Sequence, residues 1–86
     1  MTWKLRDRVT WTPTEYGGVL LDSRDGQYWT LNVTGAEILA TLLAGGSFQL
    51  AVSRVNEKFD ADPVSIAADV PALIADLEAA GLVVGS

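Results

Sequence analysis

The sequence predicts an α+β domain in which a three-stranded antiparallel β-meander is followed by three α-helices. The first third of the chain alternates apolar and polar residues, as strands do, and the remainder repeats apolar residues at helical spacing. This pattern changes once, near Asn32. Because 86 residues suffice for only one hydrophobic core, residues 1–86 are expected to form a single domain.

Short turn sequences separate the three predicted strands. Residues 9–13 alternate until proline ends the run, residues 18–22 (GVLLD) are a short apolar strand, and residues 27–31 (QYWTL) form the third strand. Residues 23–26 (SRDG) have the Asp-Gly signal and the length of a four-residue hairpin loop. Short connections imply antiparallel neighbours in chain order, which leaves the third strand at an edge of the sheet.

The first two helices have clear start and stop signals. Thr34 and Glu37 have the spacing of a capping box, with Thr34 as the N-cap, and Gly45-Gly46 ends this helix. Ser47 is the expected N-cap of the second helix. One face of that helix is predicted to be buried: Phe48, Val52, Val55 and Phe59.

The third helix is expected to begin with Asp62 as cap and Pro63 in its first turn, and to end at Gly81. Pro71 lies in its interior, where it removes a backbone hydrogen bond and favours a kink. The alternative is a helix in two pieces, with Asp69 capping the second piece. The predicted core stripe consists of Ile66, Val70, Leu73 and Leu77.

Composition excludes several functions. The chain has no cysteine and no histidine, so thiol chemistry, the usual general base and the commonest metal ligands are missing, and we expect neither catalysis nor a cofactor. The net charge is −5, and three of the six Lys and Arg residues lie in the first eight positions, expected to be mobile, which disfavours nucleic acid as a partner. Without a signal peptide or membrane-spanning run, a cytoplasmic location is expected.

The order of these signals resembles that of the PqqD family over residues 9–84. The shared features are an L-N-x-T-G-A-x-I-L stretch, a Gly-rich break, a helix ending near F-D-A-D-P and a final L-x-x-A-G-L. The matching residues are Leu31, Asn32, Thr34, Gly35, Ala36, Ile38, Leu39, Gly45, Gly46, Phe59, Asp60, Asp62, Pro63, Leu77, Gly81 and Leu82. The resemblance implies a winged helix-turn-helix-like fold and a role as a precursor-peptide recognition element for ribosomally made, modified peptides.

In such elements the leader of the precursor adds as an antiparallel strand beside the third strand, against the third helix. An acidic, free-standing chain of this length is most similar to the lasso-peptide subgroup. That likeness implies a non-catalytic module that delivers the leader to a separate leader peptidase, with a cyclase as a later partner. We expect a monomer, and pairing of the open edge with a second copy is the alternative.

The expected leader-binding site combines the third strand with one wall of the third helix. Because neighbouring strand residues point to opposite faces, Trp29, which shares a face with Leu31, is expected in the core, and Tyr28 is expected to contact the leader. Ala67, Pro71 and Ile74 are expected to form the helical wall, and exposed acids to attract basic residues of the leader. The full set is Gln27, Tyr28, Trp29, Thr30, Leu31, Ala67, Asp69, Val70, Pro71, Ile74, Asp76 and Glu78.

A winged-helix DNA-binding regulator is the alternative function. Three helices and a meander suit that architecture, and the second helix contains Arg54 and Lys58. The third helix, which would be the recognition helix, carries acids and no Lys or Arg, so the peptide-binding interpretation is preferred.

Overall fold

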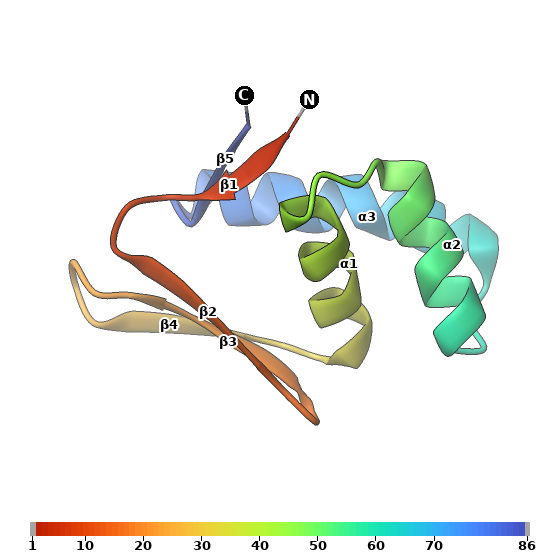
Figure 1. Ribbon diagram of the computed structural model, residues 1–86, viewed down its shortest axis with the longest axis horizontal. Helices are drawn as coiled ribbons and strands as arrows, with labels where there is room; N and C mark the ends of the chain where they lie inside the picture. The colour runs from red at the N-terminus through yellow and green to blue at the C-terminus, as the bar shows by residue number, and fades with distance from the viewer. Residues whose placement is uncertain (1, 86) are drawn as a thin grey trace.

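The computed structural model describes residues 2–85 and has a three-stranded sheet, three helices and a second sheet of two short strands (Figure 1). The α+β class and the order of meander and helices are therefore confirmed. The elements are β1 (Trp3–Leu5), β2 (Val9–Thr14), β3 (Gly17–Asp22), β4 (Gln27–Leu31), α1 (Val33–Leu43), α2 (Phe48–Lys58), α3 (Pro63–Ala79) and β5 (Val83–Gly85).

The larger sheet has the strand order β2-β3-β4, and both of its pairings are antiparallel. β4 has the bounds that the sequence predicted, residues 27–31. The loop before it, residues 23–26, is closed by a hydrogen bond from the Gly26 N–H to the Asp22 carbonyl, 2.9 Å long. Gly26 has a φ of 74°, which a residue without a side chain adopts readily.

Residues 3–5 form the strand β1, so the expectation of a mobile N-terminal segment is wrong for these residues. β1 pairs antiparallel with β5, which places Trp3 opposite Gly85 and Leu5 opposite Val83. Trp3 is buried and belongs to the hydrophobic core. The Arg6 N–H continues the attachment by donating to the Leu82 carbonyl at 3.0 Å. The two ends of the described chain thus lie side by side (Figure 1).

The N-cap of α1 is Asn32, and the prediction of Thr34 is wrong. Asn32 has an extended backbone, with φ −74° and ψ 178°, and its side-chain oxygen accepts from the Gly35 N–H at 2.8 Å. Because β4 ends at Leu31, the first residue beyond the strand is available as a cap, and asparagine is a better N-cap than threonine. The predicted caps Ser47 and Asp62 are confirmed.

α3 is one continuous helix with Pro71 inside it, so the alternative of two pieces capped by Asp69 is wrong. Its end follows the prediction. Gly81 has a φ of 78°, and the Leu82 N–H donates back to the Leu77 carbonyl at 3.0 Å, as a Schellman motif requires.

The hydrophobic core lies where α1 packs on β3 and where the helices pack on one another. α2 packs on α1 and α3 rather than on the sheet, and its buried positions are Ala51 and Val55. The predicted buried face of α2 is therefore only partly correct, since Phe48 is exposed. The fully buried large side chains are Leu20, Leu39, Leu42, Leu77, Leu82, Val55, Val70 and Val83.

Candidate functional site: an open sheet edge

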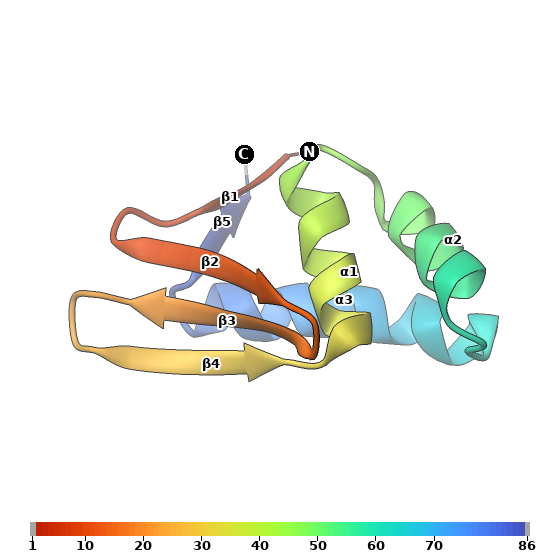
Figure 2. The ribbon, with the colours of Figure 1, turned by 60° about the horizontal axis from the view of Figure 1, so that its bottom comes forward.

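β4 lies at an edge of the larger sheet, as predicted (Figure 2). Within residues 2–85, β3 is its only strand partner. The other edge strand, β2, contains Pro13, which has no N–H to offer an incoming strand. β4 contains neither proline nor a charged residue, the usual means by which proteins protect an edge. β4 is therefore the better of the two edges for a further strand.

The direction of the free backbone groups of β4 follows from the hydrogen bonds of β3. Across the β2–β3 pair, the Ser23 N–H donates to the Arg8 carbonyl at 2.9 Å. Successive residues of a strand bond to alternate sides, so the odd-numbered residues of β3 bond to β2 and the even-numbered ones to β4. Trp29 lies opposite the even-numbered Leu20 and bonds inward. In β4 it is thus Tyr28 and Thr30 whose N–H and C=O groups point away from the sheet.

The two aromatic rings of β4 are both exposed. Tyr28 lies opposite Leu21 and is 68% exposed, in agreement with a position outside the core. Trp29 lies opposite Leu20, which is fully buried, yet Trp29 itself is 42% exposed. Trp29 therefore faces the core side without being a core residue, and that prediction is wrong. The reason is that α1 packs mainly on β3 and less on β4, so the helical layer leaves the outer strand partly uncovered.

The predicted wall on α3 divides into exposed and buried residues. Val70 is fully buried and Ile74 is 3% exposed, and both belong to the hydrophobic core. Ile74 thus takes the place on the core stripe that was expected for Leu73, which is only half-buried. Neither Val70 nor Ile74 offers a surface to a ligand in this structure. The exposed members of the predicted set are Ala67, Asp69, Pro71, Asp76 and Glu78.

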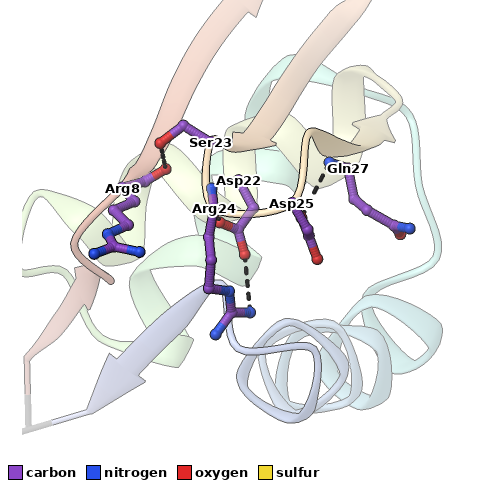
Figure 3. Close-up of polar contacts among 6 residues, drawn as sticks. All are labelled: Arg8, Asp22, Ser23, Arg24, Asp25 and Gln27. Carbon is purple, nitrogen blue, oxygen red and sulfur yellow. Dashed lines mark hydrogen bonds and ion pairs between the residues drawn. The ribbon is translucent and has the colours of Figure 1, made fainter.

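The hairpin loop that leads into β4 is held by side chains (Figure 3). Asp22, which is 5% exposed, accepts from the Arg24 N–H at 2.9 Å and from Arg24 Nη2 at 3.2 Å. Asp25 accepts from the Gln27 N–H at 3.1 Å. The Ser23 hydroxyl donates to the Arg8 carbonyl, in the turn before β2, at 3.1 Å. The sequence prediction named the turn but missed this role of Asp22, although an Asp at the start of a turn is a known signal for it.

Other kinds of site find no support in the described structure. Across residues 2–85, no three His, Cys, Asp or Glu side chains group so that they could hold a metal ion. None of the helices in the same stretch has the length and apolar character needed to cross a membrane. The surface of α3 also argues against DNA binding, because Pro63–Ala79 contains no Lys or Arg.

The fold and the open edge define a class: a small α+β domain with one uncharged strand free to pair. The chain belongs to the PqqD family, whose description is coenzyme PQQ synthesis protein D and which matches residues 17–83. Among curated proteins, no sequence matches this one.

Two solved structures are similar over nearly the whole chain. One is described as lasso peptide synthetase B1 complexed with the leader peptide; it is 32% identical, with a TM-score of 0.86 over 99% of this chain and 100% of the other. The second is TbiB1 in complex with the TbiA(beta) leader peptide, at 23% identity and a TM-score of 0.80 over 96% of each chain. At that lower identity, the second likeness shows the fold alone.

Proposed function

We propose that this chain is a non-catalytic module that binds the leader of a ribosomal, lasso-type precursor peptide by adding it as a strand to β4. The observation that carries the proposal is the open edge, where the N–H and C=O groups of Tyr28 and Thr30 point away from β3. Strand addition takes its affinity from such main-chain hydrogen bonds. The 32% identical B1 structure, which contains a leader peptide, supports the same role.

The bound leader runs antiparallel to β4. Antiparallel pairs are slightly more stable per residue than parallel ones, and both pairings of the larger sheet are antiparallel. A leader strand would cover part of the exposed surface of Trp29, which is 42% exposed without it. This burial adds apolar stabilisation, at roughly 25 cal/mol per Å² of apolar area, to the backbone bonds.

Side chains of β4 and α3 complete the proposed site. Gln27 through Leu31 supply the strand, and Ala67 and Pro71 supply an exposed surface of small side chains on α3. The exposed acids Asp69, Asp76 and Glu78 raise the association rate of a leader with basic residues, each contributing little to affinity.

In its pathway the module holds the leader for a separate leader peptidase, and a cyclase acts afterwards. These steps take place in the cytoplasm and need no cofactor of this chain. A single copy of the chain is sufficient for the role, because the free edge belongs to one protomer.

Selection of displayed peptides tests the proposal. A random library of 20-residue peptides is selected on the purified chain, together with the two leader peptides of the similar solved structures as defined probes. Amide hydrogen exchange of the chain is then measured with and without each binder. We expect the binders to slow exchange at Tyr28 and Thr30 and to leave the inward-bonded Trp29 amide unchanged. Binders that protect neither of the two outward amides, or a library without binders, would contradict strand addition.

A further inference from the structure

A pocket of about 260 Å³ lies next to the hairpin loop that joins β3 to β4. It opens between the β1–β2 turn, the β3–β4 hairpin loop and the end of α3. Three arginines line it, half of the six Lys and Arg residues of a chain whose net charge is −5. Its lining residues are Arg6, Asp7, Arg8, Asp22, Arg24 and Gly81.

The arginines of this pocket, which we call the arginine pocket, are only partly neutralised. Asp22 is bound to Arg24 through both of its oxygens, so its charge is already compensated. Arg6 and Arg8 are exposed, and their guanidinium groups have no ion pair or side-chain hydrogen bond within residues 2–85. Figure 3 shows the side chains of Arg8 and Arg24 on the same side of the hairpin. With exposed Asp7 counted, the pocket keeps a net positive charge.

The backbone of Arg8 has a conformation that residues with a side chain rarely adopt. The turn from Arg6 to Val9 is closed by the Val9 N–H donating to the Arg6 carbonyl at 3.1 Å. Arg8 lies in this turn with a φ of 73°, the one non-glycine residue with positive φ within residues 2–85. Glycine or asparagine adopts this conformation at lower cost. An arginine held in a strained backbone conformation suggests that its side chain has a use.

The position of the pocket relates it to the bound leader. A strand antiparallel to β4 passes Leu31 first and Gln27 last, so its C-terminal end leaves the sheet beside residues 23–26. Arg24 lies in that loop, three residues from Gln27. At about 3.3 Å per extended residue, the first two to five residues after the paired segment can reach the pocket.

We propose that the arginine pocket binds Asp or Glu side chains located just after the β4-paired segment of the leader. This inference rests on the proposed strand addition. It adds which side chains the domain would recognise in the leader just after the paired segment. Guanidinium groups match carboxylates in shape and charge and bind them in preference to neutral amides. The pocket thereby fixes the direction of the strand, since a leader bound the opposite way would place its acids at the other end of β4.

A double-mutant cycle tests the inference. A peptide from the displayed library that protects Tyr28 and Thr30 is compared with its own variant in which the acids after the paired segment become amides. Each is titrated by calorimetry, at low and at high salt, against the wild type and against the double variant Arg6→Gln, Arg8→Gln. This variant leaves the Arg24–Asp22 pair intact. Arg54→Gln, an exposed position on α2, controls for the loss of positive charge elsewhere.

We expect the acid-to-amide change to weaken binding to the wild type about 3- to 10-fold at low salt, as for two partly exposed ion pairs. The same change should have little effect on the double variant, and Arg54→Gln should behave as the wild type. An equal loss of affinity on the wild type and on the double variant would refute the proposed role of the arginine pocket and leave strand addition intact. Selected peptides without an excess of acids at these positions would do the same. If no binder protects Tyr28 and Thr30, strand addition fails, and the inference fails with it.

Discussion

Replacing Thr30 with proline removes one outward-pointing N–H from β4 and leaves the pairing with β3 unchanged. The hydrogen bonds from β4 to β3 are made by odd-numbered residues of β4, among them Trp29 and Leu31. Thr30→Pro therefore removes no hydrogen bond between the two strands. Trp29 is already in a strand, the conformation that a following proline favours. The leader, in contrast, is left with a carbonyl that has no donor. Such an unsatisfied group costs about 1–3 kcal/mol, or roughly a 5- to 150-fold loss of affinity.

Calorimetric titration of a selected peptide against Thr30→Pro and Thr30→Ala measures this effect. The alanine variant keeps the backbone N–H and loses only an exposed side chain, so it should bind within about threefold of the wild type. Urea unfolding of both variants checks that the fold survives. If Thr30→Pro binds the peptide as well as Thr30→Ala does, the outward direction of the Thr30 group, and with it the proposed site, is refuted.

Three further pairs of substitutions, each a test variant and its control, examine the packing and the caps. Asn32→Ala should lower the free energy of unfolding by about 1 kcal/mol in urea titration, because it removes the cap of α1. Thr34→Ala should leave the free energy of unfolding unchanged or slightly raised. A larger loss for Thr34→Ala than for Asn32→Ala would identify Thr34 as the cap instead. Gly17→Ala places a methyl group against the backbone oxygen of Leu31, whereas the methyl group of Gly26→Ala meets no atom within 4 Å. Gly17→Ala should therefore lower the free energy of unfolding by about 1–3 kcal/mol more than Gly26→Ala does, and equal losses would contradict this contact. Ile74→Asp buries a charge and should cost about 3–5 kcal/mol by the same assay, whereas aspartate at an exposed alanine of α3 should cost little.

Local signals predicted most of the architecture. The Asp-Gly loop fixes where β4 begins, and the caps Ser47 and Asp62 fix where α2 and α3 begin, because each depends on residues a few positions apart. The edge position of β4 followed from short connections in the same way.

Apart from the N-cap of α1, where Asn32 takes the place predicted for Thr34, the errors concern contacts between distant parts of the chain. β1 was missed because its strand partner is β5, about 80 residues later, and three residues carry too little periodicity to be recognised. Trp29 was assigned to the core from strand alternation, which gives the face but not whether a helix covers it. On α3, Leu73 and Ile74 are adjacent apolar residues, and only the packing of the helix decides that Ile74 is buried.

The pairing of β1 with β5 has a practical consequence for how this domain can be joined to other proteins. Trp3 and Gly85 face each other across that pair, whereas β4 lies on the opposite side of the molecule (Figures 1 and 2). A tag, a dye or a whole enzyme attached at either end therefore starts away from the strand that receives the peptide. Fusion to a partner protein at the N-terminus or at the C-terminus should therefore leave peptide binding to β4 equally unimpeded.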